Sequence, residues 1–103
     1  MALYLGVGRF RRAGLDASAV RKEANAVNTY FSTWAPPEGV ALVHLWGSVD
    51  GSGSYSVWEA DGHAALTTLV AQFLPWMDFE MIPIAEPDEF IAAQTVGGLY
   101  NTD

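Results

Sequence analysis

The sequence predicts an α+β fold in which two helices cover one face of a four-stranded antiparallel sheet. Two observations support this prediction. Four segments have the composition or the period-two alternation of strands, and two longer segments repeat apolar residues at helical spacing. The proline pair Pro36-Pro37, the glycine-rich Asp50–Gly53 and the single Pro75, which are residue types that end regular structure, stand between them. The predicted order is therefore strand, helix, strand, strand, helix, strand.

The N-terminal third of the chain contains the first strand and the first helix. Residues 2–10 (ALYLGVGRF) alternate aliphatic residues with tyrosine and glycine, as a strand does. Asp16 is placed to cap a helix whose apolar residues, from Val20 to Trp34, fall in one stripe. We expect Pro36-Pro37 to end this helix, because the residue before a proline avoids helical geometry.

The middle of the chain predicts a β-hairpin. Val40–Val49 (VALVHLWGSV) and Ser54–Ala60 (SYSVWEA) have strand composition. Between them lies Asp50–Gly53 (DGSG), whose residues tolerate the positive φ angles that hairpin turns need. The second and third strands should therefore be antiparallel neighbours.

The C-terminal part predicts a second helix and a fourth strand. Asp61 is placed to cap a helix that has an apolar side up to Phe73, and Pro75 closes it. Met77–Ala85 (MDFEMIPIA) returns as a strand. We expect this strand near a sheet edge, because Pro83 donates no ladder hydrogen bond.

The complete order, βαββαβ, is that of the ferredoxin-like fold, with a short extra C-terminal helix from about Asp88 to Val96. The 103 residues are expected to form one domain, residues 1–103. Two helices cover only one face of such a sheet, so its second face needs another cover. A homodimer that pairs two sheets face to face would supply it.

Composition excludes several function classes. The net charge of −7 argues against a nucleic-acid partner, and no apolar run is long enough to span a membrane. The chain has no cysteine, and its two histidines form no metal-binding motif, so neither a metal nor another cofactor is expected. The N-terminus does not resemble a secretory signal, which predicts a cytoplasmic location.

The basic residues are unevenly placed, because all five lie between positions 9 and 22. Arg9, Arg11 and Arg12 form a cluster with two interpretations. The cluster is either an anion-recognising corner or a solvated loop that orients dimerisation or aids solubility.

Two segments resemble a known family. Pro36–Asp61 (PPEGVALVHLWGSVDGSGSYSVWEAD) and Met77–Ile84 (MDFEMIPI) are similar to bacterial small proteins of the DUF3303 family, a domain of unknown function in the dimeric α+β barrel superfamily. The resemblance extends from about Tyr4 to Ala93. It implies a dimeric α+β barrel and supplies no activity.

A looser resemblance links Ser54–Leu66 (SYSVWEADGHAAL) to the antibiotic-biosynthesis monooxygenase and haem-degrading members of the barrel group. In those proteins a strand tryptophan enters the cavity, and Trp58 matches it. The haem-degrading members also place an asparagine on the first strand, where this chain has Gly6 and Gly8. Haem degradation is therefore not implied.

The hairpin register decides which residues share a face. A three-residue loop, Asp50–Ser52, would place Trp46 opposite Ser56 and His44 opposite Trp58. A two-residue turn would shift the register by one and mix the two sets. On the first register, the face beneath the helices carries Leu3, Leu5, Val7, Val43, Leu45, Tyr55 and Val57, and the opposite, pocket-lining face carries Tyr4, Gly6, Gly8, His44, Trp46, Ser56, Trp58, Glu80 and Ile82.

The expected pocket face mixes aromatic residues with a few ionisable groups, as small-molecule sites do. His44 and Glu80 are the candidate catalytic residues, because histidine titrates near neutral pH and a carboxylate can exchange a proton with it. The alternative roles are a hydrogen-bonded interior or interface histidine for His44 and a solvated or salt-bridged strand residue for Glu80. The candidate ligand-binding residues are Tyr4, Trp46, Ser56, Trp58 and Ile82, and the two tryptophans have the alternative role of dimer core.

Three functions fit these residues. The first is a cofactor-independent monooxygenase, cyclase or isomerase of specialised metabolism that acts on an apolar, aromatic or polyketide-like molecule by acid–base catalysis. The second is a protein that binds a small hydrophobic ligand without chemistry. The third is a structural dimerisation module. Fold-level analogy cannot choose among them, because one fold supports many activities.

Overall fold

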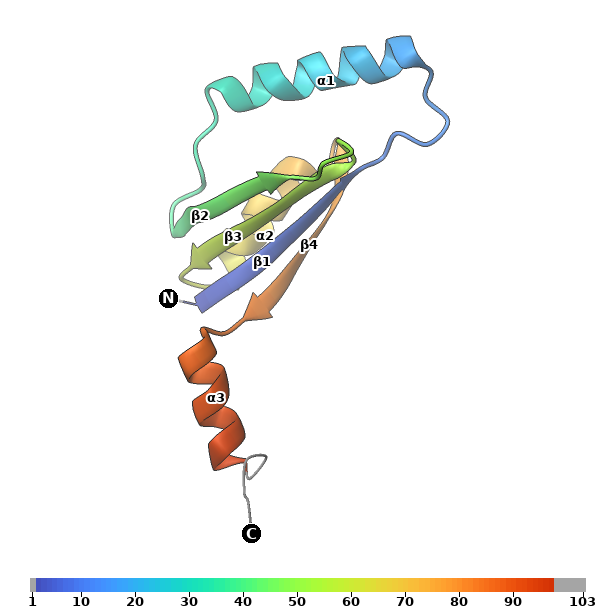
Figure 1. Cartoon of the computed structure of the whole chain (residues 1–103). Coiled ribbons are helices and arrows are strands. Elements are labelled where there is room, and N and C mark those ends of the chain that lie inside the picture. Colours follow the sequence, from blue (N-terminus) through green and yellow to red (C-terminus); the bar gives the residue numbers. More distant parts are fainter. Residues whose placement is uncertain (1, 98–103) are drawn as a thin grey trace.

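The computed structural model describes residues 2–97 and contains a four-stranded antiparallel sheet with three helices (Figure 1). The strand order β2-β3-β1-β4 is the ferredoxin-like order, and β4 is an edge strand as predicted. In chain order the elements are β1 (Ala2–Phe10), α1 (Ala17–Ser32), β2 (Val40–Gly47), β3 (Gly53–Ala60), α2 (His63–Phe73), β4 (Met77–Ile84) and α3 (Pro87–Val96).

The helix starts follow from local hydrogen bonding. The Asp16 carboxylate accepts a hydrogen bond of 2.8 Å from the backbone N–H of Ala19, so Asp16 is the N-cap of α1 as predicted. The predicted cap of α2 is wrong, because Gly62 and not Asp61 occupies the N-cap position. The backbone N–H of Asp61 instead donates to the carbonyl of Gly39, which ties the start of α2 to the segment before β2.

Helices α1 and α2 lie on the same side of the sheet. Leu66 and Leu69 of α2 are buried against it, whereas every residue of α1 keeps part of its surface accessible. Helix α1 is held at its C-terminal end, where the Phe31 ring stacks on Phe73 at a centroid distance of 5.1 Å. Helix α3 projects beyond the end of β4, away from the sheet (Figure 1).

The predicted hairpin register is wrong by one residue. Trp46 lies opposite Tyr55 and His44 opposite Val57, instead of Ser56 and Trp58. The physical reason is the closing residue, Ser48. Its N–H donates to the carbonyl of Gly53 at 3.0 Å, and its hydroxyl accepts from the Gly53 N–H at 3.0 Å. A register shift between Leu42 and His44 then adds a bulge in β2.

This register exchanges the expected faces of β1 and β3. Tyr4, Ser56 and Trp58 lie beneath the helices, whereas His44 and Trp46 lie on the opposite, open face. Gly6 helps to explain why this face lies beneath the helices. A Cβ atom at Gly6 would lie 2.9 Å from the Phe79 ring and 3.0 Å from the Trp58 indole nitrogen, so only glycine leaves room for these rings. The open face, defined by the alternation of the strands, carries Leu3, Leu5, Val7, Arg9, Ala41, His44, Trp46, Tyr55, Val57, Glu59, Asp78, Glu80, Ile82 and Ile84.

Candidate functional site

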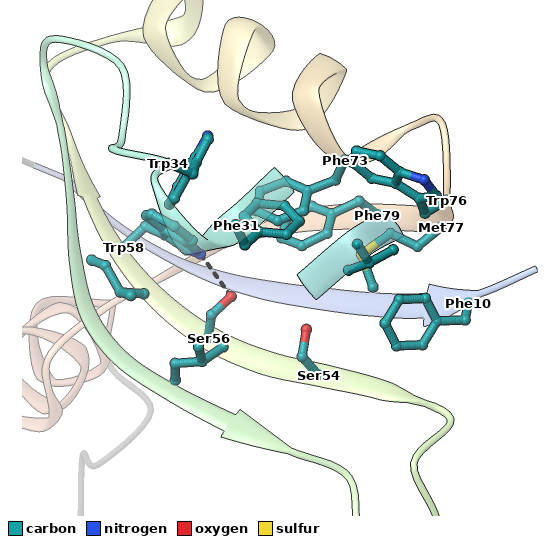
Figure 2. A pocket seen from close by; sticks show the side chains of 13 residues that line it. Phe10, Phe31, Trp34, Ser54, Ser56, Trp58, Phe73, Trp76, Met77 and Phe79 are labelled. Atoms are coloured by element: carbon teal, nitrogen blue, oxygen red, sulfur yellow. Dashed lines mark hydrogen bonds between the residues drawn. The ribbon is translucent and has the colours of Figure 1, made fainter. Parts of the chain in front are cut away.

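A cavity of about 360 Å³ lies between the helix-covered face of the sheet, the C-terminal half of α1 and the end of α2 (Figure 2). Seven of its thirteen lining residues are aromatic. The aromatic residues are Phe10, Phe31, Trp34, Trp58, Phe73, Trp76 and Phe79, and the others are Val27, Leu42, Leu45, Ser54, Ser56 and Met77.

Six of these aromatic residues form a continuous cluster that joins four elements, α1, β3, α2 and β4. The Phe73 ring at the end of α2 is stacked between Phe31 of α1, at 5.1 Å, and Phe79 of β4, at 4.6 Å. Trp34 meets the Trp58 ring edge to face at 6.2 Å. Such pairs contribute about 0.5–1.5 kcal/mol each beyond their buried area. The cluster therefore holds α1 in place and shapes the cavity wall.

Trp58 is positioned by a short hydrogen-bonded chain on the sheet floor. Its indole N–H donates to Ser56 Oγ at 2.6 Å, and the Ser56 hydroxyl donates to the Gly6 carbonyl at 3.4 Å (Figure 2). Trp58 is 2% and Ser56 1% exposed. A Cβ at Gly6 would lie only 2.5 Å from Ser56 Oγ, so glycine leaves the room that this arrangement needs.

Two other polar side chains of the cavity differ in their hydrogen bonding. The Trp34 indole N–H donates to Gln72 Oε1 at 2.9 Å. The Ser54 hydroxyl makes no hydrogen bond with any of the described residues. Figure 2 shows its oxygen directed toward the aromatic rings. Ser54 is therefore an uncommitted donor and acceptor in a largely apolar wall.

Within residues 2–97, no Asp, Glu, His, Lys, Arg or Tyr side chain lines this cavity. The two predicted catalytic residues lie elsewhere, on the open face and on the two outer strands of the sheet. His44 on β2 and Glu80 on β4 are separated by three strand spacings, roughly 14 Å. The His44 ring stacks on Trp46 at 5.1 Å. One chain by itself does not bring His44 and Glu80 together.

The predicted ligand-binding residues are divided between three places. Ser56 and Trp58 line the aromatic cavity. Tyr4 lies on the same face of the sheet but lines a separate hollow beside α2. Trp46 and Ile82 lie on the open face. The structure thus brings only one of the two predicted tryptophans to the cavity.

Sequence reasoning missed the helix residues of the cavity. Phe31 belongs to the apolar stripe of α1, which was expected to pack on the sheet, and Phe73 belongs to the apolar side of α2. Trp34, which was expected in the same stripe, follows the C-terminal end of α1. A signal was present, because aromatic residues are concentrated toward the ends of both helices. Aromatic residues that face one another across two helices favour a cavity over close packing of small side chains.

The arginine cluster ties loops together. Arg11 Nη1 lies 3.0 Å from Asp78 Oδ1, and Arg11 also donates to the carbonyl of Leu74. Arg12 Nε lies 3.4 Å from Glu23 Oε1, and its guanidinium lies 4.1 Å from the centroid of the Phe10 ring. These contacts join the β1–α1 connection to α1 and to the start of β4. Two of the three arginines therefore already have anionic partners within the chain.

In the part of the chain that the structure describes, no three His, Asp or Glu side chains are grouped as a metal site requires. Among the same residues, no helix has the length and apolar character needed to cross a membrane.

The chain matches the model of a known family. A family model described as a domain of unknown function, DUF3303, matches residues 2–97. No curated protein matches the chain significantly.

Proposed function

The chain belongs to the DUF3303 family, and because that family is a domain of unknown function, we propose a function from the cavity: it binds a small aromatic molecule without transforming it. The observation that carries this proposal is the composition of the wall. Seven aromatic side chains surround the space, and none of the described lining residues is titratable. Apolar, aromatic walls with few polar groups are typical of ligand-binding pockets.

The same wall favours binding over acid–base catalysis. A general acid or base must lie within hydrogen-bond reach of the proton that it transfers. His44 and Glu80 lie on the other face of the sheet, and Ser54 and Ser56 have no adjacent base among the described lining residues. A cofactor-independent monooxygenase, cyclase or isomerase would therefore need a proton acceptor from outside this wall. Binding requires no such group.

The volume indicates the size of the ligand. An apolar cavity of about 150 Å³ holds benzene. The cavity of about 360 Å³ therefore has room for about two fused aromatic rings with a small substituent. Phe31 and Phe79 already cover both faces of the Phe73 ring. Contacts with the rings of Phe79 and Trp58 and with the edge of Phe73 would still favour a flat aromatic molecule over a branched aliphatic one.

Titration with naphthalene, followed by tryptophan fluorescence, tests the proposal. We expect saturable binding of one molecule per chain. Val27→Trp should weaken binding at least tenfold, because Val27 lines the cavity and a larger side chain would fill it. Val49→Trp is the matched control, because Val49 lies exposed in the hairpin loop. Absence of saturable binding to the wild-type protein, or equal binding by Val27→Trp, would contradict the proposal.

Native mass spectrometry of the protein purified from its own host identifies the natural molecule. We expect a defined additional mass that organic solvent releases unchanged. Recovery of a chemically altered molecule after incubation with the released ligand would contradict binding without chemistry and would return attention to catalysis.

We also propose that a second copy of the chain covers the open face, as in a dimeric α+β barrel. Four large apolar side chains of this face are at least one-third exposed, namely Trp46, Tyr55, Ile82 and Ile84. Contiguous apolar surface of this kind is typical of protein interfaces. A self-complementary face suits a two-fold symmetric pair. Light scattering during size-exclusion chromatography should give the mass of two chains, and the mass of one chain would contradict the proposal.

A further inference from the structure

We propose that the ligand is neutral and carries one hydroxyl or carbonyl group on its aromatic ring system, and that the Ser54 hydroxyl binds this group. The inference rests on the proposed binding function and names the chemical class of the ligand. Most polar side chains of the cavity wall already have hydrogen-bond partners within the chain.

Ser54 and Trp76 are the two polar lining residues whose side chains have no hydrogen-bond partner among the described residues. The Ser56 hydroxyl accepts from Trp58 and donates to the Gly6 carbonyl, and the Trp34 indole is bonded to Gln72. Ser54 Oγ has no hydrogen-bond partner among the described residues. A hydroxyl carries one donor and two acceptor sites, so Ser54 can bind either a ligand hydroxyl or a ligand carbonyl.

The strands beside Ser54 leave its hydroxyl accessible from the cavity. Its cross-strand neighbours are Gly8 on β1 and Gly47 on β2, so neither neighbour has a side chain to cover it. A Cβ atom placed at Gly47 would meet no described heavy atom within 4 Å. On the Gly8 side, the Met77 side chain and the Phe79 ring occupy the space, so the opening beside Ser54 lies on the Gly47 side. A ligand substituent can reach the hydroxyl there.

The charge of the wall favours a neutral ligand. None of the described lining side chains is a cation that would balance a carboxylate or a phosphate. Arg12 lies over the Phe10 ring, but its guanidinium is already paired with Glu23 at 3.4 Å. The indole N–H of Trp76 is the other group to consider, and it can only donate. A neutral ligand group that both donates and accepts hydrogen bonds is therefore matched better by the Ser54 hydroxyl than by the Trp76 indole.

The test compares 2-naphthol with naphthalene by isothermal titration calorimetry. A net hydrogen bond is worth about 0.5–1.5 kcal/mol, which corresponds to roughly a two- to tenfold change in affinity. Ser54→Ala should therefore lower the ratio of naphthol to naphthalene affinity by about that factor and leave naphthalene affinity unchanged. Unchanged naphthalene binding also shows that the variant folds. Ser54→Thr, which keeps the hydroxyl, should restore the ratio.

Trp76→Phe is the matched control, because it removes the indole N–H and keeps an aromatic ring. It should leave the affinity ratio unchanged. An unchanged ratio in Ser54→Ala, or a ratio lost in Trp76→Phe, would overturn the assignment of Ser54 while the binding function stands. If wild-type protein binds neither compound, the proposed function fails and this inference fails with it.

Discussion

At the residue scale, one glycine determines how closely the cavity floor packs. Gly6 lies opposite Ser56 on β3 and Met81 on β4. The space above it is taken by Ser56 Oγ, the Phe79 ring and the Trp58 indole, all within 3.0 Å of where a Cβ would stand. The backbone of Gly6 has no positive φ, so its importance lies in this close approach.

Gly6→Ala should destabilise the fold by about 1–3 kcal/mol, because the added methyl group overpacks the floor. Urea denaturation measures the free energy of unfolding. Gly47→Ala is the control, because a Cβ there meets nothing within 4 Å and should change stability by less than about 0.5 kcal/mol. Equal stabilities for the two variants would show that the floor is less tightly packed than described.

The hairpin loop supplies a residue whose titration can be followed. Hydrogen bonds from the Ser52 hydroxyl, from the Ser52 backbone N–H at 3.0 Å and from Ser48 hold the pKa of Asp50 below its ordinary value of 3.8. A lowered folded-state pKa means that the charged form is stabilised by folding. The contribution of Asp50 to the stability of the fold is therefore fully present above pH values near its ordinary pKa. It is lost as the pH falls through the lowered pKa of the folded state.

NMR titration of the Asp50 carboxyl carbon should give a pKa below that ordinary value. Ser52→Ala should move the pKa of Asp50 back toward it, because the largest of the stabilising hydrogen bonds is removed. An Asp50 pKa that does not respond to Ser52→Ala would rule out the Ser52 hydroxyl as the main cause.

At the element scale, the helices differ in how they are attached. Helix α2 is anchored by Leu66 and Leu69, and α1 by aromatic contacts at its C-terminal end. All ten residues of α3 keep part of their surface accessible. Asp88 and Glu89 in its first turn interact favourably with the helix dipole. Isolated helices of this length are nevertheless only marginally stable in water. The sheet should therefore be the most stable part of the chain.

Hydrogen exchange should separate these elements. We expect the backbone amides of α3 to exchange faster than those of β1 by at least a hundredfold, because β1 is bonded to strands on both sides. The protein should be measured at a concentration at which light scattering gives the mass of a single chain. Equal protection of α3 and β1 under that condition would mean that α3 is held by contacts within its own chain.

At the scale of the whole molecule, the sheet separates two surfaces with different proposed roles. The cavity lies on the helix-covered face, and the exposed tryptophan, Trp46, lies on the open face. Side chains alternate between the faces along each strand, so a change on one face leaves the side chains of the other in place. Ligand binding and dimerisation should therefore be separable by mutation.

Trp46→Glu should give a single-chain mass in light scattering, because a carboxylate would have to be buried within the proposed interface. Its naphthalene affinity should stay within about twofold of the wild type, since Trp46 does not line the cavity. Val49→Glu adds the same charge at an exposed position and should remain a dimer. Joint loss of dimerisation and binding in Trp46→Glu would show that the two faces are coupled.

The sequence by itself determined the elements, their order and several of their ends. The period-two pattern of residues 2–10, the cap at Asp16 and Pro83 on an edge strand were all predicted correctly. These features depend on residues a few positions apart, so local steric and hydrogen-bonding preferences decide them. The family, too, was predicted from the sequence and is confirmed.

Only the tertiary structure decided which face of the sheet the helices cover. Leu3, Leu5 and Val7 are as apolar as a core requires, yet Gly6 and Gly8 lie beneath the helices, because large rings from other strands fill the space above them. The hydrogen bonds between Ser48 and Gly53 set a hairpin register that differs from the predicted one by one residue. In this register His44 and Trp46 lie on the opposite face from Trp58. A period of two makes every such shift a change of face, and the contacts that choose between the faces come from residues distant in sequence.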